Sequence, residues 1–416
     1  MASVTLAAGL AAVAGCGSSG PSVPSAPVLT VSRGVAAREP AASPRPLGAA
    51  DTAFGLDVLG AWCRTSPAAN LVLSPSSLAS GLGMAYLGAG GATAAAMART
   101  LHLPTTGSVL AAQLQARSAT LRALSGPGVT VTSSDQVWAD PGLTTRTSYL
   151  NAVATGYRAG VARVPFSRDP DQAAQQINRT IAAATRGHIP QLLTPELVRG
   201  LGWVLTDALY LDADWASPFA ASNTKPGPFR TAAGGQVQAK FMEGGEYRQA
   251  GAAGWTAVAL PYRGQRLTMM ALLPPATGAG TGAGGCAVPT ASALAAMTGA
   301  LAGGVTIGLP KINLSTESDL EDLLSGLGMG VAFTPAADFT GLSPQACCIG
   351  LVEQAATLQV GEKGTVASAA TAVGMEPTAA MAPPQVMFDR PYLLLVTDTG
   401  TGEPLFLARV ADPASS

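Results

Sequence analysis

The stretch NLVLSPSSLASGLGMAYLGAGGATAAAM, residues 70–97, contains the start and stop signals of a helix. Ser74 is followed directly by Pro75, and a serine at the N-cap with a proline in the first turn favours a helix start. Small and apolar residues continue to the glycines, where a helix would end. Upstream, DTAFGLDVLGAWCR at residues 51–64 predicts a second helix, with Asp51 as its cap and apolar residues at helical spacing.

Strand signals come later in the chain. Five apolar segments are bounded by Gly, Pro or Asp, which is typical of strands. They are GWVLTDALYL (202–211), RLTMMALLP (266–274), GVTIGLP (304–310), AATLQV (355–360) and YLLLVTD (392–398). Because helices dominate early and strands late, the sequence predicts an α+β fold and not a regular βαβ alternation.

Composition limits the classes of function. The 416 residues are 48% hydrophobic but only 5% aromatic, which is a soluble globular composition. The formal net charge of −1 gives no electrostatic reason to expect nucleic acid as a partner. The two histidines, His102 and His188, come with no nucleophile-elbow or metal-binding motif, and no phosphate-binding loop is present. The sequence therefore predicts neither an enzyme nor a metal or cofactor site.

Residues 1–16, MASVTLAAGLAAVAGC, are predicted to be an export signal. The apolar stretch is too short to span a bilayer. Its end, Val-Ala-Gly-Cys, is similar to a bacterial lipoprotein processing box, which would make Cys16 the lipidated residue. No Lys or Arg precedes Arg33, so a plain secretory signal is the alternative. Either signal predicts an extracellular protein, secreted or lipid-anchored at the cell surface.

Residues 17–50 are rich in Ser, Pro, Ala and Gly and have few bulky apolar side chains. Such a segment does not bury enough apolar surface to offset the entropy of ordering. It is predicted to be a disordered tether, and the globular domain is predicted to cover residues 51–413.

Four cysteines lie in the predicted domain: Cys63, Cys286, Cys347 and Cys348. None has the paired spacing of a zinc site, and the adjacent pair can bridge only with strain. A Cys63–Cys286 bond is conceivable in an oxidising compartment, but free or buried thiols are the expectation.

Several blocks of the chain, in family order, resemble the serpins. Besides residues 70–97, the matching blocks are INRTIAAATRGHIPQLL (177–193), LTDALYLDADWASPF (205–219), VALPYRGQRLTMMALLP (258–274), LPKINLSTESDLEDLLSGLGMGVAF (309–333), ADFTGLS (337–343) and FDRPYLLLVTDTGTGEPLFLARV (388–410). The resemblance implies a fold with three β-sheets, about nine helices and an exposed reactive loop near the C-terminus.

The resemblance places the hinge and reactive loop at about residues 361–384. In inhibitory serpins a target protease cleaves this loop, which then enters the largest sheet as a new strand. The hinge residues would be Glu362, Lys363, Gly364, Thr365, Ala367, Ala369 and Ala370. From Gly364, two alternating faces can be traced to Met375, and neither carries a charge or a proline that would resist insertion. Val366 departs from the family, which usually has Glu there.

A hinge without charges or prolines between Gly364 and Met375 favours the hypothesis that the protein inhibits serine proteases. The alternative is a non-inhibitory serpin that acts as an extracellular binding protein. Counting from the hinge places the cleaved bond at Thr378-Ala379, whereas counting back from the C-terminal block places it at Ala380-Met381. None of these residues is Arg or Lys, so elastase-like or subtilisin-like partners are expected and not trypsin-like ones. The inhibitor is expected to be a monomer.

Five residues match the region where the sheet of a serpin opens. Ser74 and Ser77 match two family serines beneath the sheet, whereas Asp207 and Gln354 replace the family's Asn and His. Trp215 matches a family tryptophan near the point of loop entry. The alternative for Ser74, Ser77, Asp207 and Gln354 is that they only satisfy one another in the core, and the alternative for Trp215 is an ordinary core tryptophan.

A remote alternative is an exported serine hydrolase. Ser222-Asn223-Thr224-Lys225 matches the Ser-x-x-Lys pattern of penicillin-binding proteins, which requires both side chains on the first turn of a helix. Pro226 and Pro228 follow at once, and the accessory Ser-Asp-Asn and Lys-Thr-Gly motifs are absent, so this match is expected to be a coincidence.

Overall fold

The computed structural model describes residues 28–275, 286–365 and 384–415. Nine α-helices lie within these ranges: α1 (Arg45–Thr65), α2 (Pro75–Tyr86), α3 (Gly91–Thr100), α4 (Gly107–Arg122), α5 (Thr147–Tyr157), α6 (Pro170–Ala184), α7 (Pro195–Val198), α8 (Ala291–Gly299) and α9 (Glu321–Leu324). The predicted helix at Ser74 and Pro75 is present as α2, and the hydroxyl oxygen of Ser74 caps it by accepting a hydrogen bond from the amide of Ser77.

The described residues also form sixteen strands. They are β1 (Val31–Ser32), β2 (Leu71–Leu73), β3 (Val129–Ala139), β4 (Val161–Arg163), β5 (Trp203–Asp214), β6 (Thr224–Arg230), β7 (Gln236–Ala252), β8 (Trp255–Pro261), β9 (Leu267–Leu273), β10 (Ala302–Pro310), β11 (Ile312–Asp319), β12 (Glu353–Gly361), β13 (Gly364–Thr365), β14 (Gln385–Met387), β15 (Tyr392–Asp398) and β16 (Pro404–Val410). All five predicted strand segments coincide with β5, β9, β10, β12 and β15.

The strands form the three sheets of an α+β fold. One sheet is separate, and the other two are joined to each other through a shared strand. One sheet has the order β1-β4-β3-β5-β13-β12-β11. The other strands follow the order β14-β10-β7-β8-β9-β15-β16-β2, with β6 beside β7. The long strand β7 joins two of the sheets, because its first part pairs with β6 and its last part pairs with β8. Gly244 and Gly245, both at positive φ, lie between these two parts.

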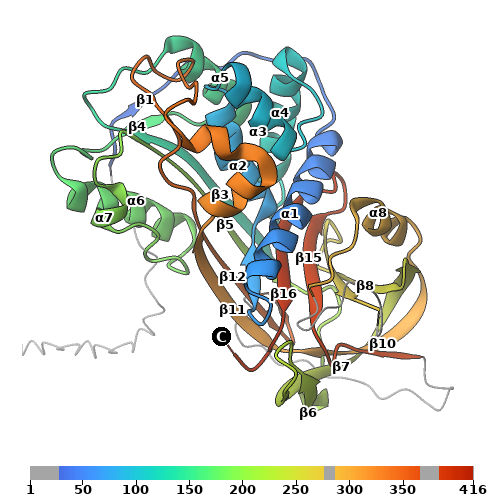
Figure 1. The fold of residues 1–416 in the computed structure, drawn as a ribbon. Helices are drawn as coiled ribbons and strands as arrows, with labels where there is room; N and C mark the ends of the chain where they lie inside the picture. Colours follow the sequence, from blue (N-terminus) through green and yellow to red (C-terminus); the bar gives the residue numbers. More distant parts are fainter. Residues whose placement is uncertain (1–27, 276–285, 366–383, 416) are drawn as a thin grey trace, which may run out of the picture.

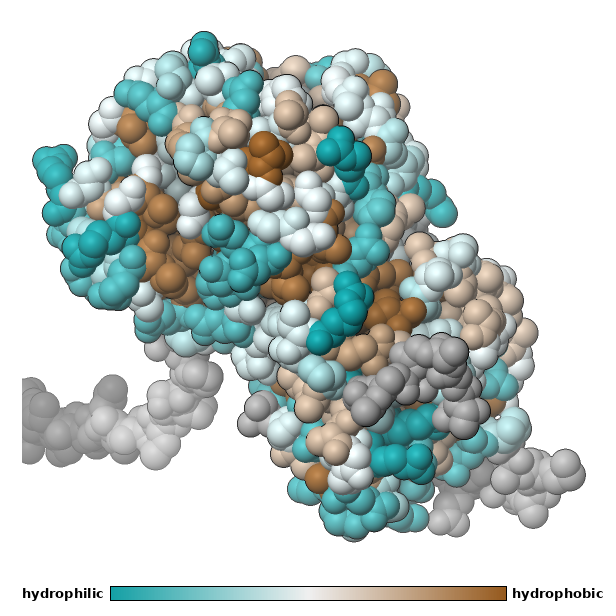
Figure 2. Space-filling model, viewed as in Figure 1, coloured by the Kyte–Doolittle hydropathy of each residue, from teal (hydrophilic) through white to brown (hydrophobic). Residues whose placement is uncertain are grey.

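Most of the helices lie toward one end of the seven-stranded sheet, whereas α8 lies beside β8, and β6, β7 and β10 lie toward the other end (Figure 1). Helix α6 covers β3 and β5, and its buried Ile177 and Ile181 pack against Trp138 and Ala208 of these strands. A larger apolar core lies between the sheets. In Figure 2, apolar side chains on this face form patches toward the middle, and hydrophilic side chains cover much of the rim. None of the described helices combines the length and apolar character that crossing a bilayer requires.

The prediction of a disordered tether over residues 17–50 is wrong for the described residues 28–50. The strand β1 extends the seven-stranded sheet by pairing with β4. Beyond it, the amides of Val35 and Ala37 donate to Asn151 Oδ1 and Thr155 Oγ1, both at 2.8 Å. Helix α1 then begins at Arg45, six residues before the predicted cap. Residues 28–44 are called the N-terminal strap below.

Asp51 is therefore not a helix cap. It lies within α1, only 1% exposed, and accepts a hydrogen bond of 2.6 Å from Arg117 Nη1 of α4. Burial raises the pKa of the Asp51 carboxyl, and the charge of Arg117 opposes that rise. The buried guanidinium of Arg117 thus offsets the cost of burying the Asp51 carboxylate, which the sequence pattern alone assigns to the surface.

The N-terminal strap gives a stability prediction. A Cβ atom at Gly34 would lie 2.2 Å from the backbone carbonyl carbon of Leu150, so Gly34→Ala should push the strap away from α5. We expect this substitution to lower the free energy of unfolding by about 1–3 kcal/mol, measured by urea denaturation. Gly126→Ala is the matched control, because a Cβ atom there meets nothing within 4 Å. Equal free energies of unfolding for the two variants would mean that the N-terminal strap contributes nothing to stability.

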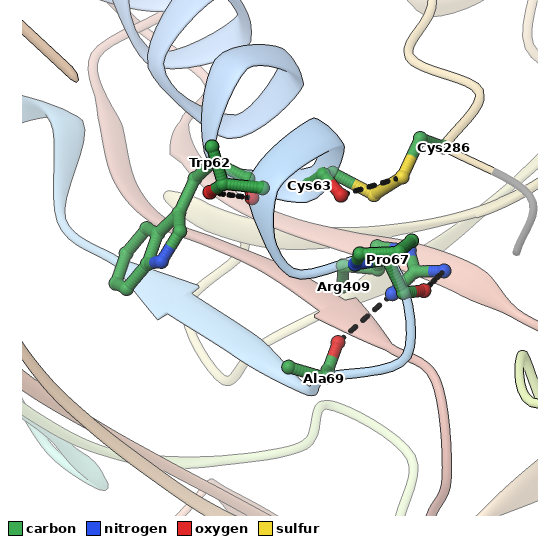
Figure 3. Close-up of a disulfide and its surroundings, with 7 residues drawn as sticks. Trp62, Cys63, Pro67, Ala69, Cys286 and Arg409 are labelled. Atoms are coloured by element: carbon green, nitrogen blue, oxygen red, sulfur yellow. Dashed lines mark hydrogen bonds between the residues drawn. A yellow bond between two sulfur atoms is a disulfide. The ribbon is translucent and has the colours of Figure 1, made fainter.

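Cys63 and Cys286 form a disulfide, so the expectation of free thiols is wrong for this pair. The bond joins α1 to the segment before α8 across 223 residues of sequence (Figure 3). Beside it, the buried Arg409 donates to the carbonyl oxygens of Ala69 and Pro67, each at 2.8 Å. Cys347 and Cys348 are free, as expected, and both are exposed.

Candidate functional site

The seven-stranded sheet has an incompletely filled position between β5 and β12. Both strands pair antiparallel with the two-residue β13, so β5 and β12 run parallel to each other. Among the described residues, no ladder joins these two long strands directly. On their outer sides both are fully paired, β5 with β3 and β12 with β11. The edges of β5 and β12 therefore face each other, and β13 supplies ladder hydrogen bonds to both at one end of the gap.

The hinge residues Gly364 and Thr365 occupy that end. Gly364 is opposite Gly361 of β12 and Asp214 of β5, and Thr365 is opposite Val360 and Ala213. A Cβ atom at position 364 would lie 2.0 Å from the carbonyl oxygen of Ala213. Only glycine fits this close approach to the neighbouring backbone, so the glycine is a requirement of strand entry.

Thr365 is already buried beneath the sheet, with 1% exposure. Its hydroxyl is 2.5 Å from the hydroxyl of Tyr262, which follows β8. The Tyr262 ring stacks on Trp215 at a centroid distance of 4.5 Å. Burial raises the pKa of the Tyr262 hydroxyl, so this group stays protonated and available as a hydrogen-bond donor. A small polar side chain is thus accommodated where a charged one would have no partner.

Trp215 also holds the turn that leads into β13. Its indole Nε1 donates to the carbonyl oxygen of Gly361 at 2.9 Å, and its amide donates to that of Lys363 at 2.7 Å. The amide of Phe219 donates to the carbonyl oxygen of Glu362 at 2.8 Å. The segment after β5 therefore satisfies the carbonyl groups of the whole hinge turn, and Trp215 is placed beside the point of entry.

The Glu362 side chain is fixed in the same turn. Its Oε2 lies 2.8 Å from Lys311 Nζ, and its Oε1 accepts a hydrogen bond of 3.0 Å from Thr224 Oγ1. Partial burial raises the pKa of this carboxyl, but the hydrogen bonds from Lys311, the backbone and Thr224 outweigh burial and lower it overall. The carboxylate therefore stays charged and ties the hinge to the strands around it.

Three of the predicted sheet-opening residues meet at the other end of the gap. Gln354 Nε2 donates to the carbonyl oxygen of Ser74 at 3.2 Å, and Ser74 Oγ accepts from the amide of Ser77 at the same distance. Gln354 is 8% exposed, and its Oε1 is buried without a described partner. Asp207 lies in the middle of β5, opposite Asp135 of β3. The predicted contact between its side chain and the serines falls outside what the structure describes.

A small cavity adjoins these residues. It has a volume of about 40 Å³ and lies between α2, β5 and the start of β12, with Ser77, Leu205 and Gln354 in its wall. Ile349, Leu351 and Val352, which lead into β12, form another part of that wall. Because a space of this size can hold about one water molecule, local rearrangement here meets less resistance than in a close-packed core.

Glu353, the first residue of β12, predicts a pH dependence of stability. Partial burial, and then the charges of Asp319 and Glu317, raise the pKa of its carboxyl to about 7. A raised carboxyl pKa means that the folded state binds the proton more tightly, so stability falls as the pH rises from 4.5 to about 7. We expect Glu353→Gln to raise the melting temperature above pH 5, with its full effect above pH 7 and none at pH 4.

The measurement is thermal unfolding of both proteins between pH 4 and pH 8. Glu317→Gln, at an exposed position of β11, is the control and should have a smaller effect. If the melting temperatures of Glu353→Gln and the parent chain differed by the same amount at every pH in this range, the raised pKa of Glu353 would be contradicted.

Other predicted residues are placed elsewhere or lie outside the described ranges. Ser222 lies in a short 3-10 helix and Lys225 in β6, so the two residues do not share the first turn of an α-helix. His102 pairs with Asp57 at 2.7 Å on the surface, and His188 packs against Tyr210. In the described ranges no three His, Cys, Asp or Glu side chains cluster as metal ligands. The predicted residues outside the described ranges are Cys16, Ala367, Ala369, Ala370, Thr378, Ala379, Ala380 and Met381.

Sequence reasoning missed the partners of the hinge. Tyr262, Lys311, Thr224 and Phe219 are between 51 and 143 residues away from the hinge residues they bind, and none carries a local motif. Phe219, Tyr262 and Lys311 do lie inside matching blocks, at 205–219, 258–274 and 309–333, and this is the signal that the sequence offers for them. Their role depends on tertiary contacts that no short pattern encodes.

Comparison with known proteins agrees with this geometry. A family model described as Serpin (serine protease inhibitor) matches residues 49–413. An uncharacterized serpin-like protein of Thermococcus kodakarensis is 30% identical over 83% of this chain and 81% of its own length. A leukocyte elastase inhibitor of Bos taurus is 28% identical over 88% of this chain and 99% of its own.

Two solved structures share the fold. Native protease nexin-1 with heparin has a TM-score of 0.75 at 24% identity and covers 89% of this chain and 100% of its own. Thyroxine-binding globulin in complex with thyroxine has the same TM-score and identity and covers 88% of this chain and 99% of its own.

Proposed function

This chain belongs to the serpin family, and on that basis we propose that it is an inhibitor of serine proteases and not an enzyme. The protease would accept the loop within residues 361–384 as a substrate. Its serine would attack the carbonyl carbon of the reactive bond, expel the amine of the following residue and remain joined to the loop as an acyl-enzyme. Insertion of the loop between β5 and β12 would then carry the protease away before water releases it.

The observation that carries this proposal is the buried position of Thr365 between two strands. Thr365 is opposite Val360 and Ala213, and both partner strands run antiparallel to the entering segment. Extending this register by two residues puts Ala367 opposite Leu358 and Leu211, which are both buried. Every second residue of the loop would therefore face the core.

The residues of that inward series suit the core. They are Ala367, Ala369, Thr371, Val373 and Met375. None carries a charge, and none is a proline, so each could join a central strand without an unpaired charge or a lost ladder bond. The outward series begins at Val366 and has the same property up to Gly374.

The proposed target class follows from the candidate bonds at residues 378–381. Thr, Ala and Met are small or apolar, and no Arg or Lys occurs between Gly364 and Asp389. A trypsin-like pocket requires a cation, whereas elastase-like and subtilisin-like pockets accept small or apolar groups. The bovine relative named as an inhibitor of leukocyte elastase supports this choice.

The test is to mix the protein with an elastase and with subtilisin and to separate the products on a denaturing gel. A covalent adduct of inhibitor and protease, with loss of protease activity, is the expected result. An equimolar mixture with trypsin is the control and should give no adduct. Complete loop cleavage by elastase and subtilisin with full protease turnover would overturn the proposal.

That last outcome would instead favour a non-inhibitory serpin that acts as an extracellular binding protein. The similarity of this fold to thyroxine-binding globulin makes the alternative concrete, because that structure contains a bound small molecule. A fold shared at 24% identity does not transfer the ligand.

We further propose that the protein acts outside the cytoplasm, as a secreted or lipid-anchored monomer. The Cys63–Cys286 disulfide is typical of oxidising compartments. Metabolic labelling with a radioactive fatty acid distinguishes the two forms of export. Label that disappears in Cys16→Ser would indicate a lipid anchor, and unlabelled protein in the medium would indicate plain secretion.

A further inference from the structure

Cys347 and Cys348 are adjacent, exposed and free in a chain that forms a disulfide elsewhere. The residues on either side of them are fixed. The amide of Ala346 donates to the carbonyl oxygen of Ser343 at 3.2 Å, and that of Ile349 donates to Ala332 at 2.9 Å. Both flanking side chains pack against an apolar core. The two cysteines are thus held at the surface between two anchored positions.

The two thiols belong to neighbouring residues and influence each other. The thiol of Cys348 shares a hydrogen bond with that of Cys347 and lies near the carboxylate of Glu321 in α9. Partial burial, the contact with Cys347 and the negative charge of Glu321 raise the pKa of Cys348 to about 11. Because only a thiolate attacks a disulfide, the raised pKa disfavours Cys348 as the residue that reacts first.

We propose that Cys347 and Cys348 form a thiol–disulfide exchange site, which low-molecular-weight disulfides such as oxidised glutathione convert reversibly to a Cys347–Cys348 bond. Adjacent cysteines bridge only with strain, and strained, exposed disulfides are the readily reduced ones. The site would therefore respond to the redox state of the surroundings, whereas the Cys63–Cys286 bond would persist.

The reaction has two steps. Cys347 attacks one sulfur of oxidised glutathione, forms a mixed disulfide and expels one glutathione thiolate, which takes up the proton that Cys347 lost. Cys348 then attacks the Cys347 sulfur and expels the second glutathione, which takes up the proton from Cys348. The two protein thiols lose two electrons in total, and the glutathione disulfide gains them.

The site has a direct connection to the gap in the sheet. Ile349, Leu351 and Val352 follow the cysteines and line the cavity beneath the gap together with Gln354. The carbonyl oxygen of Val352 accepts a hydrogen bond of 2.9 Å from the amide of Leu320. A ring closed at residues 347 and 348 changes the backbone just ahead of this segment, so oxidation would shift or stiffen the start of β12. Any effect on loop insertion rests on the proposed function.

The test uses the purified full chain in glutathione buffers from fully reduced to fully oxidised. Intact mass and thiol titration should show the loss of two hydrogen atoms and two free thiols under oxidising conditions, and recovery under reducing ones. Peptide mapping should place the new bond at residues 347 and 348 and find Cys63–Cys286 unchanged. Two thiols that stay free, or stable glutathione adducts on both cysteines, would overturn the proposal.

Variants separate the steps. Cys347→Ser and Cys348→Ser should each keep one thiol and stop at a mixed disulfide, and the double variant should not respond. Hydrogen exchange of residues 349–353 should differ between the oxidised and reduced parent chain but not in the double variant. Equal hydrogen exchange of residues 349–353 in the oxidised and reduced parent chain would overturn the proposal that oxidation affects the start of β12. No protease takes part in these measurements, so failed inhibition would leave their result intact.

Discussion

Thr365→Arg is expected to convert the proposed inhibitor of elastase-like proteases into a substrate of these proteases. Thr365 is 1% exposed and is enclosed by β5, β12 and the hydroxyl of Tyr262. An arginine at this position must either bury an unpaired charge or keep the hinge out of the sheet. The cost of burying a charge without a partner is several kcal/mol.

The size of the effect follows from a competition between two rates. In the proposed mechanism, the acyl-enzyme is either trapped by loop insertion or released by hydrolysis, and the substitution leaves the rate of hydrolysis unchanged. If about 3 kcal/mol of the cost is present in the transition state of insertion, insertion slows by about 100-fold. Adducts on the denaturing gel should then be replaced by cleaved inhibitor and active protease.

Val366→Arg is the matched control for this experiment. It introduces the same side chain one residue later, and strand alternation puts it on the opposite face of the inserting segment. The serpins usually have a charged residue at this position, so inhibition should persist. If Thr365→Arg forms adducts as efficiently as Val366→Arg, the buried face has been assigned wrongly. Thr365→Ser, which keeps the hydroxyl, should inhibit normally.

The sequence predicts those features of the fold that have a local cause. The start of α2 follows from the side chain of Ser74 and the ring of Pro75, both of which act within one turn. The five predicted strands are rich in apolar residues and are bounded by Gly, Pro or Asp, which distinguishes them from the turns on either side. The serpin resemblance adds the sheets and the position of the hinge, which no local pattern provides.

The features that sequence reasoning missed all depend on distant partners. The N-terminal strap has few apolar side chains, and its order comes from backbone hydrogen bonds to residues more than 100 positions away. The disulfide spans 223 residues, and nothing near Cys63 or Cys286 indicates the pairing. The two-residue β13 is ordered only because β5 and β12 flank it. Composition therefore underestimates order wherever a folded surface supplies the bonds.

Cleavage of the loop between residues 375 and 382 is expected to raise the melting temperature by about 20 °C. About ten residues after Thr365 would enter the gap and add roughly twenty backbone hydrogen bonds to β5 and β12, which are already ordered. At about 1 kcal/mol net for each bond, less roughly 1 kcal/mol per residue for ordering the loop, the gain is on the order of 10 kcal/mol. For a domain larger than 200 residues, each kcal/mol corresponds to about 2 °C.

The measurement is circular dichroism during heating, before and after limited proteolysis. A double variant, Thr365→Arg with Ala369→Asp, is the control, because its cleaved loop carries two charges on the face that must be buried. It should show no increase in melting temperature after the same cleavage. An unchanged melting temperature in the cleaved parent chain would mean that the intact fold holds no free energy in reserve. The unfilled position between β5 and β12 would then be a static feature of the sheet, and trapping of a protease would have no driving force.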